Sequence, residues 1–338
     1  MKSLFGLETQ QQFVRVYNYH KERADRGEHV TWQDVQDDMG INNDRNLRAL
    51  RTQAEATFQC KFPAFNQKYS PRRFSKLPFG TLEIESDNPI VLPTCSDVHA
   101  WPTKYTPITD AFRVYLNVLE ELAKDHEKEL VVVVNGDMFD GASISRHPSI
   151  RWEYKPSVKE ELDACKEYAE AIERAVEGHP NVRLVWVWGN HDERFDSKLA
   201  NMVGEFKDIE GFSLVDHFPR WEFTQALLVN HCAYFVHDVH AGKHAAYNNV
   251  QDFGPNVHVF TGHTHRLTTR TKTFFTGRGK ATETGTLCDI GYPQFQYVRG
   301  NPVDWQPGFV VVNIHGQHCH EELVEVDTHA MWRGEDWL

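Results

Sequence analysis

The chain has 338 residues, of which 40% are hydrophobic and 25% charged, a composition typical of a folded protein with an apolar core. Its formal net charge of −12 argues against a protein that coats nucleic acid through its overall charge. The longest apolar run, residues 130–134, is far too short to span a membrane, and the N-terminus lacks the apolar segment of a signal peptide. We therefore expect a cytoplasmic protein without a membrane partner.

The N-terminal region differs in charge from the rest of the chain. Residues 1–80 carry 13 Lys and Arg against 9 Asp and Glu, a net charge of +4. The sequence pattern predicts a polar helix over residues 8–26 and two short helices around a tight turn within residues 30–56. This arrangement has the outline of a helix-turn-helix, so we predict a helical module over residues 1–61.

Three arginines on the second short helix are candidate nucleic-acid contacts. Arg45, Arg48 and Arg51 recur at three-residue spacing, which places them near one face of a helix. The alternative is a small structural helical cap with solvated arginines. The sequence leaves both interpretations open.

Residues 62–80 are predicted to be a linker, because they mix Pro, basic and aromatic residues without helical or strand periodicity. Arg72 and Arg73 are candidate nucleic-acid contacts here, since basic and aromatic side chains together suit single-stranded nucleic acid. The alternative is an ordered linker whose aromatic side chains pack on the main domain.

From residue 81 the pattern is strand–helix–strand, and we predict one α/β domain over residues 81–316. The predicted strands are 81–85, 89–95, 130–135, 182–188, 222–229, 233–237, 257–261, 268–275 and 308–314, and the predicted helices are 107–125 and 156–177. An α/β first half followed by a β-rich second half favours two packed sheets with helices outside. Residues 317–338 form an acidic, Trp-containing tail that either packs back on the domain or lies at an interface.

Five short segments in this domain carry metal-binding residue types, most of them directly after an apolar, β-branched run. They are Asp97-Val98-His99, Asn135-Gly136-Asp137 with Asp140, Gly189-Asn190-His191-Asp192, His237-Asp238, and Gly262-His263-Thr264-His265. Strand ends gather distant residues at one edge of a sheet, where α/β active sites lie. Within the first and last segments the pairs at i and i+2 would share a strand face.

The ligand types indicate the kind of metal. Asp, Asn and His without Cys favour Mn, Fe, Zn or Co over a thiolate site. These segments offer more candidate ligands than one ion can bind, so we expect two divalent ions that share one carboxylate, Mn²⁺ first, with Fe, Zn, Co and Ni as alternatives. Paired ions about 3.5–4 Å apart clamp the attacking and leaving oxygens in phosphoester hydrolysis.

The order D-x-H, GD-x-x-D, GNHD, H and GH-x-H resembles the calcineurin-like metallophosphoesterases of phage and bacterial type, distantly similar to SbcD-type nucleases. The resemblance covers about residues 85–315. It implies a four-layer α/β/β/α sandwich with a dinuclear metal centre, in the host cytoplasm if the protein is phage-encoded.

The resemblance also implies residue roles. The first metal would be held by Asp97, His99 and His265, the second by Asn190, His237 and His263, with Asp137 bridging them. A bridging hydroxide would attack phosphorus. His191 would protonate the leaving oxygen or stabilise the phosphorane, Asp192 would orient the His191 ring, and Asp140 would hold His99.

The fourth segment departs from the family pattern, which has His-Gly where this chain has His237-Asp238. We favour His237 as the ligand because it directly follows an apolar strand, and His240 is the alternative. Lys243 and His244, just after a glycine, are candidate phosphate-binding residues or a solvated surface.

The sequence indicates the type of reaction more clearly than it indicates the substrate. Protein phosphatases of this superfamily carry Arg after the second-motif aspartate and GNHE in the third motif, whereas this chain has Gly141 and Asp192. We therefore predict a phosphodiesterase, and the basic N-terminal region favours nucleic acid, DNA before RNA, which makes the protein a nuclease. The alternatives are a small-molecule or cyclic-nucleotide phosphodiesterase or phosphatase, and a non-catalytic DNA-binding protein. The oligomeric state is not predicted.

Overall fold

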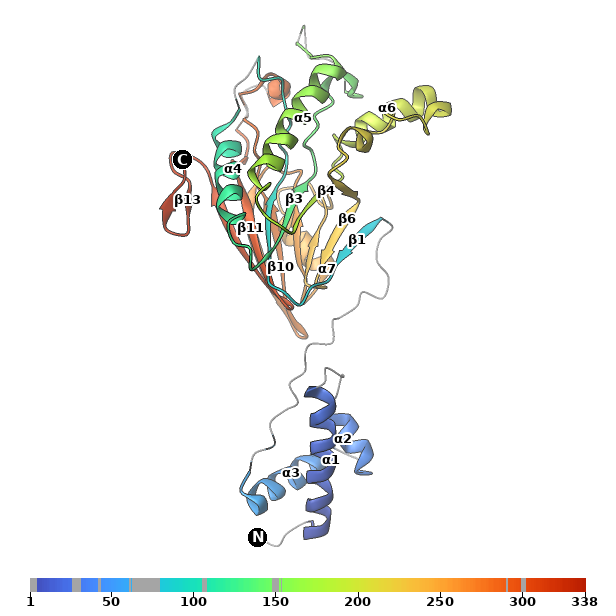
Figure 1. Cartoon of the computed structure of the whole chain (residues 1–338), viewed down its shortest axis with the longest axis vertical. Helices are drawn as coiled ribbons and strands as arrows, with labels where there is room; N and C mark the ends of the chain where they lie inside the picture. Colours follow the sequence, from blue (N-terminus) through green and yellow to red (C-terminus); the bar gives the residue numbers. More distant parts are fainter. Residues whose placement is uncertain are drawn as a thin grey trace. The chain divides into compact units, whose positions relative to one another are not determined.

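A computed structural model describes residues 5–25, 32–41, 44–60, 62, 80–104, 108–147, 152, 154–289, 291–298 and 302–338. The chain divides into two compact units, Met1–Arg73 and Phe74–Leu338 (Figure 1). Arg72 and Arg73 of the predicted linker lie outside the described residues. In the part of the chain that the structure describes, no helix combines the length and the apolar character needed to cross a membrane.

The N-terminal unit contains the three predicted helices, α1 (Leu7–Asp25), α2 (Trp32–Asp38) and α3 (Asp44–Phe58). Gly40, with φ +63°, follows α2 and allows the chain to turn into α3. The helices pack around a small apolar core that includes Phe13, Leu50 and Phe62. His20 of α1 joins Asp38 of α2 through an Nε2–Oδ2 contact of 2.8 Å.

The larger unit contains two six-stranded sheets. The first has the strand order β1 (Thr81–Ile84), β6 (Ala226–Val229), β7 (Ala233–Phe235), β8 (His258–Thr261), β10 (Gly277–Thr284), β9 (Leu267–Phe274). The second has the order β12 (His318–Glu325), β11 (Gly308–His315), β2 (Ile90–Cys95), β3 (Glu129–Asn135), β4 (Val182–Val187), β5 (Glu222–Thr224).

The apolar run of β3 is buried on both faces of its sheet. Val131 and Val133 point into the core between the two sheets, while Leu130, Val132 and Val134 point into the core beneath the helices. Such two-sided burial is why the strand reads as an unbroken run of valines rather than as an alternation.

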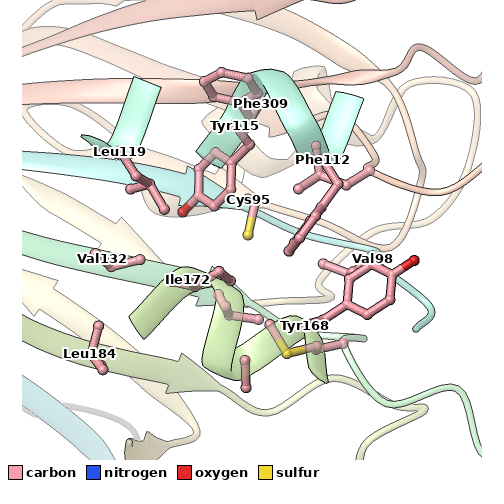
Figure 2. Close-up of a cluster of buried hydrophobic side chains, with 14 of the residues drawn as sticks. Cys95, Val98, Phe112, Tyr115, Leu119, Val132, Tyr168, Ile172, Leu184 and Phe309 are labelled. Atoms are coloured by element: carbon pink, nitrogen blue, oxygen red, sulfur yellow. The ribbon is translucent and has the colours of Figure 1, made fainter. Parts of the chain in front are cut away.

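Helices cover the outer faces of both sheets. On the second sheet, α4 (Asp110–Leu122) packs over β11 and β2, and α5 (Val158–Ala175) shares the same core, as Figure 2 shows for Tyr115 with Phe309 and for Ile172 with Val132. On the first sheet, α7 (Ala245–Phe253) packs over β8 and β10. The result is the predicted four-layer α/β/β/α sandwich, which is thereby confirmed together with its small helical N-terminal module (Figure 1).

The remaining elements lie in the connections. They are the helix α6 (Glu193–Val203), the 3₁₀ helices η1 (Ala142–Ile144), η2 (Gly204–Phe206), η3 (Leu214–His217) and η4 (Pro293–Val298), and the short strands β13 (Met331–Trp332) and β14 (Glu335–Asp336). Of these, α6 and η1 border the site described below.

Two sequence-based boundaries are corrected by the structure. Residues 222–229 form two strands, β5 and β6, because the chain leaves the second sheet and enters the first between Thr224 and Ala226. Residues 317–338 are part of the domain rather than a separate tail. The strand β12 pairs with β11 over its full length, and Trp332 is buried in the core.

Candidate metal centre

The five ligand segments follow the ends of β2, β3, β4, β7 and β8, so both sheets contribute to one site. The strands β2, β3 and β4 run parallel, as do β7 and β8, which brings their carboxyl ends to the same side of each sheet. Residues that are up to 168 positions apart in the sequence therefore meet here.

The first cluster consists of Asp97, His99 and His265, all buried. His265 Nε2 lies 3.1 Å from Asp97 Oδ1 and 3.3 Å from His99 Nε2. Three lone-pair-bearing atoms that converge in this way are the arrangement of ligands around a cation.

The second cluster consists of Asp137, His237 and His263, with Asn190 beside it. His237 Nδ1 donates to the Asn135 carbonyl at 2.7 Å, which directs Nε2 to within 3.1 Å of Asp137 Oδ2. That buried Nε2 has no hydrogen-bond partner among the described residues. An orphaned imidazole nitrogen facing a carboxylate fits a metal ligand, so the residues present fit the metals that the sequence predicts.

Asn190 completes the second cluster, because its Oδ1 lies 2.8 Å from His263 Nδ1. The two clusters are also joined directly, since the His263 main-chain N–H donates to both carboxylate oxygens of Asp97, at 3.1 and 2.9 Å. All seven predicted ligands are thus brought together in one region.

The backbone of this site is unusual. The left-handed region, rare for residues with a side chain, is occupied by five predicted ligands: Asp97 (φ +52°), His99 (+45°), Asp137 (+56°), His263 (+68°) and His265 (+59°). Conformations of this kind cost free energy and gather at functional sites, where the surrounding structure enforces them. The expected sharing of a strand face by the i, i+2 pairs is therefore wrong, because both pairs lie in turns beyond β2 and β8.

Three glycines permit the close approach of the ligand segments. A Cβ on Gly136 would lie 2.2 Å from His237 Nδ1, and one on Gly189 would lie 2.2 Å from Asp137 Oδ1. On Gly262 it would lie 2.8 Å from His237 Nδ1. The glycine of each motif is thus required by the space that the ligands occupy.

Asp140 contacts two histidines. His99 Nδ1 donates to Asp140 Oδ1 at 2.8 Å, as predicted, and this turns His99 Nε2 toward the first cluster. His191 Nδ1 donates to the main-chain carbonyl of Asp140 at 2.9 Å. The rings of His99 and His191 meet edge to face, with centroids 4.5 Å apart.

The predicted contact of Asp192 with the His191 ring is wrong. The buried Asp192 carboxylate instead accepts hydrogen bonds from the main-chain N–H groups of Asp137, Phe139 and Gly189 and from Trp186 Nε1, at 2.8 to 3.0 Å. Asp192 therefore ties together the loops after β3 and β4, and Asp140 orients the His191 ring.

The electrostatics of the site favour positive charge. Burial alone would raise the pKa of Asp97, but the neighbouring His265 lowers it to about 2. Burial would likewise lower the pKa of His237, but Asp137 raises it to about 10. The carboxylates are ionised at neutral pH and hold a cation between them, a proton or a metal ion.

Arg194 is a site residue that the sequence analysis missed. Its guanidinium donates to the Asp140 carbonyl through Nη1 and to His191 Nε2 through Nη2, both at 2.9 Å. It follows His191 by three residues on the first turn of α6, a helix that was not predicted. The three-residue spacing from His191 to Arg194 was the available signal, but it points to a contact only if a helix is predicted there.

The alternative fourth-motif ligand is not in the site. His240 is half-buried and pairs with Asp252, with Nε2 2.8 Å from Oδ2. Asp238 is exposed. Lys243 and His244 are exposed directly before α7 and join none of the ligand clusters among the described residues.

Two aromatic side chains border the first cluster. Trp305 lies with its ring 4.1 Å from that of His265, and Phe295 lies 5.3 Å from the ring of His99. Trp305 thus packs directly against a predicted ligand.

The candidate nucleic-acid contacts of the N-terminal unit differ in their surroundings. Arg45 and Arg48 are exposed on α3. Arg51 is half-buried, lies 5.0 Å from the Trp32 ring centroid and pairs with Glu55. Arg51 therefore contributes to packing within the unit.

Comparisons with known proteins show which family has a sequence and a ligand order like those of this chain. Residues 94–267 match the model of the calcineurin-like phosphoesterase family. The Gene 54 protein of Mycobacterium phage L5 is 28% identical over 215 residues, and that of Mycobacterium phage D29 is 30% identical over 219 residues. Each of these alignments covers 58% of this chain and 81% of the relative.

A solved structure is also similar. It is a yeast (Saccharomyces cerevisiae) protein serine/threonine phosphatase with similarity to human phosphatase PP5, and it aligns at 12% identity and a TM-score of 0.35, covering 74% of this chain and 84% of that one. The family match spans every ligand segment, and the chain belongs to the calcineurin-like phosphoesterase family.

Proposed function

We propose that this protein is a metal-dependent phosphodiesterase that cleaves nucleic acid, DNA in preference to RNA. The family acts on phosphoric esters, and its members typically bind two divalent metal ions. The observation that carries the proposal is the pair of adjoining His/Asp clusters, which include six of the seven predicted ligands, with Asn190, the seventh, beside the second cluster.

In this proposal one ion would be held by Asp97, His99 and His265, and the other by Asn190, His237 and His263. Asp137 would be the carboxylate that they share. Its Oδ1 accepts from the His191 main-chain N–H at 2.8 Å, which leaves Oδ2 facing His237. When bound, the two ions, Mn²⁺ in our proposal, supply positive charge that stabilises the anionic transition state.

His191 acts at the leaving oxygen. Because Nδ1 donates to the Asp140 carbonyl, Nε2 is the nitrogen available to the substrate. In the structure Nε2 accepts from Arg194, so it carries no proton in that arrangement. A phosphate oxygen that draws Arg194 away would allow Nε2 to take up a proton and deliver it to the leaving group.

Three features favour a nucleic-acid diester. The N-terminal region is basic, α3 exposes Arg45 and Arg48, and Gly141 and Asp192 stand where protein phosphatases carry Arg and Glu. A phosphodiester carries less charge than a phosphomonoester and needs less neutralisation, which suits a site without a dedicated arginine clamp after the second motif.

A phosphomonoesterase is the second candidate, and Arg194 is the observation in its favour. Its guanidinium stands at the edge of the site beside His191, where it could neutralise the second charge of a phosphomonoester. The small-molecule and cyclic-nucleotide diesterases remain alternatives of the same chemistry.

The test compares two substrates on chelator-stripped protein supplied with Mn²⁺. We expect bis-p-nitrophenyl phosphate, a diester, to be hydrolysed faster than p-nitrophenyl phosphate, with DNA and RNA oligonucleotides cleaved next. Preference for the monoester would establish the second candidate. Activity on none of these substrates, with DNA binding retained, would favour the non-catalytic DNA-binding alternative.

The role of the N-terminal unit is tested separately. We expect the double variant Arg45→Ala/Arg48→Ala to bind labelled DNA several-fold more weakly than the wild type. The matched control is Arg15→Ala/Lys21→Ala, which removes the same charge from exposed positions on α1. Equal loss in both variants would show a general charge effect and remove α3 as the contact surface.

A further inference from the structure

A groove borders the candidate metal centre. It encloses about 550 Å³ between the exposed face of α6 and the segment that follows η1. Asn190 lines the groove and also contacts His263 of the second ligand cluster, so the groove and the candidate metal centre adjoin at this residue.

The groove is lined by positive charge. Arg194 and Lys198, four residues apart on α6, lie on the same helix face, and Arg146 faces them from the segment after η1. Glu193 is the one carboxylate among the lining residues. Three cations against one anion make this a surface for a phosphate-bearing ligand, in a protein whose net charge is −12.

The position of Arg194 relates the groove to the chemistry. Its two hydrogen bonds, to the Asp140 carbonyl and to His191 Nε2, hold the guanidinium at the boundary between the groove and the metal centre. Lys198 lies about one helical turn beyond Arg194 on α6, Arg146 lies in the segment after η1, and both are exposed. A ligand that uses all three cations must therefore extend away from the reacting phosphorus.

The volume of the groove limits how much of a ligand can lie beyond the reacting phosphorus. Cavities of about 300–1,000 Å³ hold small organic ligands, so this groove accommodates roughly one nucleotide unit. Isolated diesters and cyclic nucleotides carry one phosphate only and would leave the distal cations without a partner.

We propose that the groove between α6 and η1 binds the phosphate adjacent to the scissile one, so that the enzyme selects a nucleic-acid strand over an isolated or cyclic phosphodiester. This inference rests on the proposed phosphodiesterase function and specifies the substrate class of the same site. Arg194 positions the strand at the boundary, and Arg146 and Lys198 bind the neighbouring phosphate.

The test uses the double variant Arg146→Ala/Lys198→Ala of the full chain. Steady-state cleavage of an oligothymidylate, which has neighbouring phosphates, is compared with cleavage of bis-p-nitrophenyl phosphate, which has none. We expect kcat/KM for the oligonucleotide to fall about tenfold more than kcat/KM for the small diester, mainly through KM. A second readout needs no turnover: fluorescence anisotropy of labelled oligothymidylate with chelator-treated protein should show about tenfold weaker binding.

The matched control is Lys159→Ala/Arg174→Ala on α5, which removes the same charge from exposed, ion-paired positions. It should leave both substrates and the binding constant near wild type. If the groove variant loses no selectivity, or no more than the control, the groove proposal is overturned while the phosphodiesterase stands. If the wild type cleaves the small diester but no oligonucleotide, the nucleic-acid substrate fails and the groove proposal fails with it.

Discussion

Asp140 accepts a hydrogen bond from His99 Nδ1 at 2.8 Å, and this contact determines which nitrogen of His99 faces the first ligand cluster. Partners of this kind fix the tautomer and the ring orientation of a metal ligand, and their loss costs about 10–100-fold in metal affinity. We expect Asp140→Ala to weaken Mn²⁺ binding by that factor, measured by isothermal titration calorimetry on chelator-stripped protein. Asp140→Asn keeps an acceptor oxygen and should lose less. Equal affinity of Asp140→Ala and wild type would show that His99 orients itself.

We expect Asp192 to contribute to the stability of the fold rather than to the reaction itself. Four N–H donors converge on its carboxylate, among them the main-chain groups of Asp137 and Gly189 and the indole of Trp186. Asp192→Asn places an amide N–H against these donors, and we expect the free energy of unfolding to fall by about 1–3 kcal/mol in urea titrations. The control is Glu193→Gln on the neighbouring exposed side chain. An unchanged Asp192→Asn midpoint would contradict this role.

Gly189 is required by space rather than by backbone conformation. An added Cβ would lie 2.2 Å from Asp137 Oδ1 and 2.4 Å from the Asp137 main-chain nitrogen. We expect Gly189→Ala to displace Asp137 and to reduce both Mn²⁺ affinity and hydrolysis at least tenfold. Gly178→Ala is the matched control, because a Cβ there meets no atom within 4 Å. Wild-type metal binding in Gly189→Ala would show that the two loops can separate without loss.

Glu161 should give the protein a recognisable pH dependence. Its buried carboxylate holds η1 by accepting from the main-chain N–H of Ala142 and the hydroxyl of Ser143. Burial, with a smaller effect of Asp140, raises the pKa of Glu161 from 4.5 to about 7. The folded state therefore binds more protons than the unfolded chain between these pH values. The contribution of Glu161 to stability consequently falls as pH rises from 4.5 to 7, by about 3 kcal/mol, and is constant above that window.

The measurement is the free energy of unfolding at pH 5 and pH 8 for wild type and Glu161→Gln. The variant cannot ionise, so the drop between the two pH values should be smaller in the variant by that amount, whatever its absolute stability. Parallel pH profiles for the two proteins would show that Glu161 keeps an ordinary pKa.

Much of the architecture could be predicted from local patterns. The run Leu130–Val134 is apolar throughout because β3 is buried on both faces, and this signal does not depend on any distant residue. The helix α6 escaped prediction because it buries only Phe195 and presents a polar face to solvent and to the groove. Likewise β12 was assigned to a tail, since its sequence has few apolar residues and its strand conformation depends on pairing with β11.

The sequence by itself determined which side chains are available for the chemistry. The Asp, Asn and His residues of five motifs, each next to a strand, were recognisable because ligand type and strand pattern are local properties. The tertiary structure alone decided how they are used. It assigned Asp140 rather than Asp192 to the His191 ring, and it placed Arg194 at the site. The physical reason is that these contacts are set by how two sheets pack and by left-handed turns at the strand ends, which join residues far apart in the chain.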